Sequence, residues 1–255
     1  MTARHHGRVV LITGGGNGIG AATAAAVVRE GGRAVLGDIN IAAAQERAAE
    51  LGDSALAVPL DVALEESWRG YVEAALERFG RIDGLVNNAG IATGHGLLDT
   101  DGPEMARILA VNTIGPFLGI KAVLDTMRAA GSGSIVNISS CAGLAGLRSN
   151  VAYSTSKYAI RGLTQTLVHE LGGYGIRINS VFPGYVDTPL SRPEWEDQSA
   201  AGQQPANVAL GRTGHPRELA EVVAFLLSDE ASYCTGSEFV ADGGLMSVVP
   251  AREIG

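Results

Sequence analysis

A glycine-rich turn near the start of the sequence places the strongest constraint on the fold. It joins a short, β-branched apolar run, Val9–Thr13, to an alanine-rich stretch with strong helix propensity, Ala21–Glu30. Strand, tight turn and helix in this order let a pyrophosphate approach bare backbone N–H groups at a helix N-terminus. The spacing is T-G-x-x-x-G-x-G rather than the strict G-x-G-x-x-G. The turn residues expected to contact a dinucleotide are Gly14, Asn17, Gly18, Ile19 and Gly20.

Short apolar runs alternate with helical stretches along the rest of the chain. After Val9–Thr13 and Ala34–Asp38, the expected strands are Ala55–Leu60, Gly84–Asn88, Ser134–Ser140, Arg177–Phe182 and Glu238–Ala241. This alternation predicts an α/β fold with a doubly wound, seven-stranded parallel sheet flanked by helices, and ligands bound at the carboxyl ends of the strands. With 255 residues, 46% of them hydrophobic, and no linker or repeat, we expect one domain over residues 1–255.

The second expected strand ends in an acid, Asp38, eighteen residues after Gly20. In a dinucleotide-binding fold, a carboxylate at this spacing accepts hydrogen bonds from the adenosine ribose and repels a 2′-phosphate. Asp38 could instead cap a helix or close a turn, but its place after a strand favours the ribose contact, with Ile39 beside it. NAD is therefore the expected cofactor, although Arg33 lies nearby in the sequence and selectivity need not be absolute.

Tyr153 and Lys157 stand one helical turn apart and share a helix face. At an effective dielectric of about 20 and roughly 5 Å, the ammonium would lower the pKa of the phenol by about two units. Ser140 lies thirteen residues upstream of the tyrosine, at the end of an apolar run. The Tyr–Lys pair alone could be a surface coincidence, but together with the glycine turn and Asp38 it indicates an active site.

In this combination the sequence resembles the short-chain dehydrogenase/reductase family over nearly its whole length. The motifs that carry the resemblance are Thr13–Gly20, Asp61-Val62, Asn87–Gly90, Asn112, Ser140, Tyr153, Lys157, Pro183-Gly184 and Thr188. The resemblance implies a single Rossmann-type domain, a nicotinamide cofactor and hydride transfer at a secondary alcohol or ketone.

The catalytic assignments combine this resemblance with the chemistry. Alcohol oxidation needs one base beside the hydride acceptor, and we assign that role to Tyr153. The resemblance implies that Lys157 also holds the nicotinamide ribose, that Ser140 bonds the substrate oxygen and that Asn112 holds a proton-relay water. Strand alternation and the interval to the tyrosine favour Ser140 over Ser139. Asn112 could instead be a polar helix residue bonded to nearby backbone.

Further cofactor contacts are implied by the resemblance alone. They comprise an acid and a valine at the adenine, a loop along the adenosine and its ribose, and a segment that meets the carboxamide and phosphates. In that order the residues are Asp61 and Val62; Asn87, Ala89 and Gly90; and Pro183, Gly184, Val186 and Thr188. Several of them could serve only as turn, loop or cap residues.

The segment Tyr185–Arg212 interrupts the alternation, because it is polar, contains three prolines and is too long for an ordinary connection. It resembles the family's substrate lid, although it could be a plain surface excursion. The candidate pocket residues are apolar, which suggests a hydrophobic alcohol or ketone. They are Leu144, Leu147, Val151, Tyr185, Leu190 and Trp195. The chain resembles bacterial hydroxysteroid and cyclic-alcohol dehydrogenases, but carrier-protein ketoacyl reductases share the same motifs.

Composition limits the partners. A net charge of −8 and a pI near 5.1 argue against a nucleic-acid or anionic-membrane surface. Two cysteines, Cys141 and Cys234, suit neither a disulfide framework nor a zinc site, and we expect no metal. No secretory signal and no run near eighteen apolar residues is evident, so we expect a cytoplasmic protein. His5 and His6 are expected in a mobile tail.

Two other classes of protein remain alternatives. One is a regulatory protein that binds a dinucleotide without turnover, although such relatives usually lack the tyrosine or the lysine. The other is an epimerase, dehydratase or dehalogenase on the same scaffold. His95 could line the lip of the site or be an ordinary solvated residue.

The two helices expected over Met105–Met127 and Tyr153–Leu171 are too apolar for one sheet-facing stripe to bury. The apolar positions are Ile108, Leu109, Val111, Ile114, Phe117, Ile120, Ile160, Leu163 and Leu167. In the resembled family these helices pair across a two-fold axis and the C-terminal strand region forms a second interface. Two such interfaces generate a homotetramer.

Overall fold

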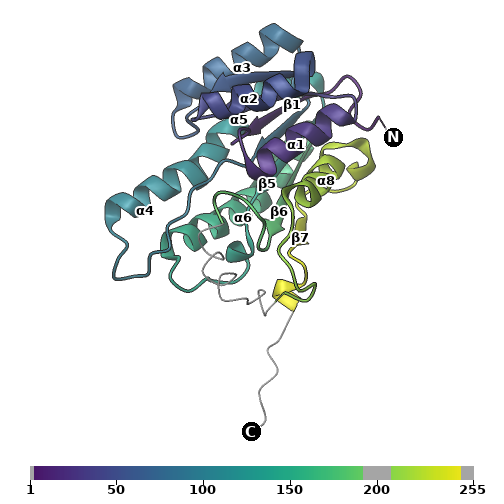
Figure 1. The fold of residues 1–255 in the computed structure, drawn as a ribbon. Helices are drawn as coiled ribbons and strands as arrows, with labels where there is room; N and C mark the ends of the chain where they lie inside the picture. The colour runs from purple at the N-terminus through teal and green to yellow at the C-terminus, as the bar shows by residue number, and fades with distance from the viewer. Residues whose placement is uncertain (1–2, 192–207, 248–255) are drawn as a thin grey trace.

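The seven expected strands form one parallel sheet in the order β3-β2-β1-β4-β5-β6-β7, which confirms the predicted fold class (Figure 1). The computed structural model describes residues 3–191 and 208–247. The strands are β1 Val9–Thr13, β2 Arg33–Asp38, β3 Ala55–Pro59, β4 Gly84–Asn87, β5 Gly133–Ile138, β6 Ile176–Pro183 and β7 Glu238–Ala241. The strand order reverses between β1 and β4, and at that point the carboxyl ends of the strands open a crevice.

Helices cover both faces of the sheet, as Figure 1 shows. The first layer contains α1 (Gly18–Arg29), α2 (Ile41–Leu51) and α8 (Pro216–Leu227), which pack on one core cluster. The opposite layer contains α3 (Glu65–Phe79), α5 (Gly115–Ala130) and α6 (Val151–Gly172), which pack on the other. Every residue of β1 is buried, because both sheet faces are covered, and this explains why the strand is a continuous apolar run.

The expected helix Met105–Met127 is divided in the structure. α4 (Gly102–Leu109) passes through a π-helical turn, Ala110–Ile114, into α5. By length and composition the whole run Gly102–Ala130 could cross a membrane, with a mean hydropathy of 1.4 in a window that is 39% buried. The sequence-based expectation that no segment approaches this threshold is therefore wrong. Core helices of globular proteins meet the same criterion, and α5 contributes Ile120 and Met127 to the core.

The N-terminal residues also differ from the prediction. His5 is fully buried, with its Nε2 3.7 Å from Glu30 Oε2, and burial lowers its pKa. Arg4 holds the same carboxylate with two hydrogen bonds of 2.7 and 2.6 Å. The His5 backbone N–H donates to the Glu30 carbonyl. A mobile tail is therefore the wrong assignment for His5, because the acid at the end of α1 fastens this arm to the body.

Candidate active site

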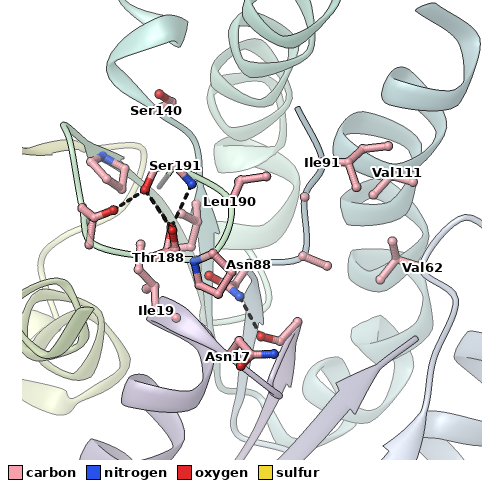
Figure 2. Close-up of a pocket in the computed structure, with 18 of the residues that line it drawn as sticks. Asn17, Ile19, Val62, Asn88, Ile91, Val111, Ser140, Thr188, Leu190 and Ser191 are labelled. Atoms are coloured by element: carbon pink, nitrogen blue, oxygen red, sulfur yellow. Dashed lines mark hydrogen bonds between the residues drawn. The ribbon is translucent and has the colours of Figure 1, made fainter. Parts of the chain in front are cut away.

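A cavity of about 350 Å³ lies at the carboxyl ends of the strands, at the predicted position (Figure 2). Its walls come from the turn after β1, the ends of β2 to β6, and α6. The predicted site residues on its walls are Gly14, Asn17, Gly18, Ile19, Asp38, Ile39, Asp61, Val62, Ala89, Gly90, Ser140, Tyr153, Lys157, Pro183, Gly184, Val186 and Thr188. Segments far apart in the sequence thus meet around one cavity.

Three predicted site residues do not lie on its walls: Gly20, Asn87 and Asn112. A Cβ atom on Gly20 would lie 2.2 Å from the Gly14 carbonyl oxygen, so this glycine allows α1 to pack on the turn. Asn87 is buried and donates to Asn137 Oδ1 at 2.8 Å. Asn112 brackets the backbone of Ile91, accepting from its N–H at 2.9 Å and donating to its carbonyl at 2.8 Å. These residues support the walls from behind.

The glycine turn forms a floor that side chains would obstruct. Gly14 and Gly18 have φ angles of 64° and 55°, and a Cβ atom on Gly18 would lie 3.1 Å from Thr188 Cγ2. The N-cap residue of α1, Asn17, makes no side-chain capping bond. The first N–H groups of α1 therefore remain suited to an anion, and the floor fits a pyrophosphate.

Asp38 is fixed at the opposite end of the cavity from α6. Its carboxylate accepts hydrogen bonds from the N–H groups of Gly16 and Asn40, both at 2.9 Å. Arg33, in contrast, is the first residue of β2 and lies at the amino-terminal ends of the strands, with its guanidinium 5.4 Å from the centroid of the Phe79 ring. Its nearness to Asp38 in the sequence does not bring it to the site. Among the described residues that line the cavity, only Asp38, Asp61 and Lys157 carry charge.

α6 brings Tyr153 and Lys157 to the same side of the cavity. The Lys157 ammonium lies 5.6 Å from the centroid of the Tyr153 ring and donates to the Ile138 carbonyl at 2.9 Å. Lys157 is only 4% exposed, and burial lowers its pKa to about 8. The ammonium is therefore held next to the phenol in an environment that disfavours its charge.

Both serines lie just beyond β5 rather than within the strand. Ser139 is buried and donates to the Lys157 carbonyl at 3.0 Å, whereas Ser140 accepts from the Ala142 N–H at 3.1 Å. Figure 2 shows Ser140 at the edge of the cavity. Cys141 is buried beside Asp242, and desolvation followed by that carboxylate raises its pKa to about 12. Such a thiol is a poor nucleophile.

Several lining residues were missed from the sequence: Asn88, Ile91, Val111 and Ser191. Asn88 donates from Nδ2 to the Thr13 carbonyl at 2.9 Å, and Thr13 Oγ1 accepts from its N–H at 3.0 Å. Adjacent residues at a strand end face opposite ways. Alternation of this kind could have selected Asn88 over the buried Asn87, but the expectation that it excludes Ser139 from the site is wrong, because Ser139 and Ser140 both line the cavity.

The segment after β6 closes the cavity on the remaining side. Thr188 Oγ1 lies 2.9 Å from Ser191 Oγ, which donates to the Val186 carbonyl, and Leu190 extends over the opening (Figure 2). Much of the predicted lid 185–212 falls outside the described residues, Trp195 included. Leu190 is the one predicted pocket residue on the wall. Leu144, Leu147, Val151 and Tyr185 are not among the described residues that line the cavity.

Comparison with known proteins identifies the family. The family model described as "Enoyl-(Acyl carrier protein) reductase" matches residues 14–246. The chain belongs to the short-chain dehydrogenase/reductase family. This short-chain dehydrogenase/reductase is therefore an oxidoreductase of CH–OH groups that uses a nicotinamide dinucleotide.

Its relatives include dehydrogenases of known substrate. It is 44% identical over 255 residues to a "3-alpha-(or 20-beta)-hydroxysteroid dehydrogenase" of Mycobacterium tuberculosis, covering 100% of this chain and 95% of that protein. A "Cyclopentanol dehydrogenase" of Comamonas testosteroni is 40% identical over 244 residues, covering 94% and 98%. The crystal structure of levodione reductase matches with a TM-score of 0.91 at 37% identity, covering 96% of this chain and 100% of that one.

Proposed function

We propose that this enzyme interconverts hydrophobic secondary alcohols and ketones with NAD as its cofactor and Tyr153 as general acid and base. One observation carries the proposal. Among the described residues, a single cavity joins an end that holds Asp38 and no basic side chain to an end that holds Tyr153 and Lys157. A protein that only binds a dinucleotide would not need Tyr153 and Lys157 in this cavity.

The proton chemistry follows from the side chains. The bound nicotinamide would accept or donate the hydride. Tyr153 takes the hydroxyl proton in oxidation and returns one in reduction, and the nearby Lys157 ammonium stabilises the phenolate. Ser140, whose oxygen accepts only from Ala142 within the described residues, keeps its own proton to donate to the substrate oxygen.

Asn112 is proposed to act behind Lys157. A Cβ atom on Gly90 would lie 3.4 Å from Asn112 Oδ1 and 3.6 Å from Lys157 Nζ, so these two polar atoms face each other across a glycine. A relay water would sit near this gap. Asn112 also donates to Ser156 Oγ at 3.0 Å, which fixes its amide.

The preference for NAD rests on charge. A 2′-phosphate at the adenosine ribose would meet the Asp38 carboxylate, and no arginine among the described residues lines the cavity to neutralise it. Arg33 is at the wrong end of β2 to do so.

The substrate class rests on the walls and on the relatives. Ile91, Val111, Ile138 and Leu190 give the cavity apolar walls, and the relatives are named for steroid and cyclopentanol substrates. The description of the family model names an acyl-carrier-protein reductase, which keeps a carrier-bound ketoacyl substrate as the alternative.

The test is a panel of NAD and NADP against hydroxysteroids, cyclic alcohols, sugar alcohols and β-ketoacyl thioesters, followed by nicotinamide absorbance. We expect turnover of steroids or cyclic alcohols with NAD. Turnover confined to ketoacyl thioesters, or a preference for NADP, would contradict the proposal.

We also propose a homotetramer. Ile108, Ile120 and Ile160 are buried within the chain, but Ile114 and Phe117 remain 49% and 43% exposed, and Tyr158 of α6 is 42% exposed. Near the C-terminal strand, Tyr233 and Val240 are exposed as well. Light scattering should give a mass near four times 26.2 kDa. A monomer at micromolar concentration would refute both interfaces.

A further inference from the structure

A carboxylate outside the cavity fastens the loop 91–100, between β4 and α4, at two points. Thr93 Oγ1 donates to Glu104 Oε1 at 2.6 Å, and His95 Nδ1 lies 2.8 Å from Glu104 Oε2. Glu104 belongs to the first turn of α4, where its own N–H donates to the N-cap Asp101 at 2.8 Å. The hydrogen bond from Thr93, and then that from His95, hold the pKa of Glu104 below its ordinary value. We call these three side chains, Thr93, His95 and Glu104, the Glu104 clamp.

The clamped loop reaches the active site at two points. Ile91 lines the cavity, and the His95 carbonyl accepts the backbone N–H of Val151 at 3.2 Å. Val151 is the first residue of α6, and the N-cap residue Asn150 makes no side-chain capping bond. The His95 carbonyl therefore satisfies one of the free N–H groups at the start of α6, where Asn150 caps none with its side chain. Tyr153 lies two residues further along the same turn.

The same loop supports a strained residue before α6. Ser149 has a φ of 57°, and it is the one non-glycine residue in the left-handed region among the described parts of the chain. A Cβ atom on Gly96 would lie 3.9 Å from Ser149 Cα, so the two loops touch. A non-glycine residue keeps such a conformation only where its surroundings hold it. The loop 91–100 is one of those surroundings.

We propose that Glu104 is a positioning residue which, through His95, fixes the N-terminus of α6 and with it the placement of Tyr153 against the substrate. The inference rests on the proposed function, because it assigns to Tyr153 the proton transfer described above. Within the described residues, no bond of the clamp touches the glycine turn or Asp38. The clamp should therefore govern proton transfer to and from the substrate and leave dinucleotide binding unchanged.

Kinetics of Glu104→Ala provide the first test, with Glu66→Ala as the matched control. Glu66 is an exposed acid on α3 that pairs with Arg69 at 2.8 Å, away from the site. Glu104→Ala should lower kcat/KM for the best alcohol by about fivefold to tenfold, mainly through kcat. The dissociation constant for NADH, followed by fluorescence, should stay within about twofold. Because Glu104 and His95 act through one hydrogen bond, kcat/KM of the double variant Glu104→Ala, His95→Ala should be no lower than kcat/KM of either single variant.

Hydrogen exchange of the cofactor-free protein provides the second test. Peptides that contain the Val151 amide should exchange faster in Glu104→Ala and in His95→Ala, but not in Glu66→Ala. His95→Gln, which keeps a donor toward Glu104, should restore protection. Unchanged exchange in Glu104→Ala would overturn the inference. A loss of NADH affinity as large as the loss of kcat/KM, together with a lower melting temperature, would overturn it as well, because Glu104 would then be a general stability residue. The exchange result stands even if the wild type turns over no alcohol, so it separates failure of the clamp from failure of the proposed function.

Discussion

The two ends of the cavity are built by different means. At the dinucleotide end the contact surface is mostly backbone, shaped by Gly14 and Gly18 in left-handed conformations and by Asp38 holding two N–H groups. At the catalytic end it is made of side chains from β5, α6 and the segment after β6. The first end comes from two adjacent strand–turn units, and the second from three separate segments between Ile138 and Ser191. A local motif can specify the former, whereas only the complete fold assembles the latter.

The Tyr153→Phe variant should separate the function of the catalytic end, which is turnover, most clearly from that of the dinucleotide end, which is cofactor binding. Removing the phenol oxygen eliminates proton transfer, so kcat should fall by about 10²–10⁴-fold. Dinucleotide affinity, measured by fluorescence titration, should be nearly unchanged. A variant that retained half the rate would refute the assigned role.

Lys157→Met tests whether one residue serves both ends. We expect loss of both turnover, by about a hundredfold or more, and dinucleotide affinity. An unchanged affinity would contradict the assigned contact with the nicotinamide ribose.

The same variant has a consequence for stability. Because the pKa of Lys157 is lowered from 10.5 to about 8, the unfolded chain binds the proton more tightly, and burial of the ammonium costs about 3 kcal/mol below pH 8. The stability of the wild type relative to Lys157→Met should therefore rise between pH 8 and pH 10.5. Denaturant titrations of the two cofactor-free proteins across this range would measure it. A constant difference would show that the ammonium is not desolvated.

Gly20→Ala perturbs the dinucleotide end alone. The new Cβ atom would lie 2.2 Å from the Gly14 carbonyl oxygen, so the turn must shift, at a cost of about 1–3 kcal/mol in stability. Dinucleotide affinity should fall with it. Gly70→Ala on α3 is the control, because no atom lies within 4 Å of its added Cβ. Equal melting temperatures for the two variants would contradict the steric account.

The smallest effect is expected from Asp38→Ala. Loss of the carboxylate should raise kcat/KM for NADP relative to NAD by about tenfold, because like-charge repulsion disappears while no arginine is gained. Steady-state kinetics with both cofactors would measure this shift. A wild type that already prefers NADP would remove the basis for the role of Asp38.

Sequence reasoning predicted the sheet and the catalytic pair for identifiable reasons. Buried parallel strands leave continuous apolar runs, and positions four apart on a helix must share a face. It did not place Arg33, because Arg33 and Asp38 are close in the sequence but lie at opposite ends of β2. It also missed the burial of His5, which depends on an ion pair between Arg4 and Glu30, twenty-six residues apart. The clamp on Glu104 could not be predicted either, because it joins a loop to a helix with no periodic pattern.

The fastened N-terminal arm has a consequence for how the chain is made. Arg4 reaches Glu221 across 217 positions, and Arg8 donates to the Leu227 carbonyl at the end of α8 at 2.7 Å. During synthesis Arg4 and Arg8 leave the ribosome long before these partners, which lie 217 and 219 positions further along the chain. β1 can pair with β2 early, and the bonds of the arm to Glu30 can form with them, but the contacts of Arg4 and Arg8 with α8 have to wait until α8 has been translated. The side-chain contacts of Arg4 and Arg8 with α8 therefore form last, and pulse-labelled hydrogen exchange during refolding should show the amides of α8 protected after those of the arm, β1 and β2.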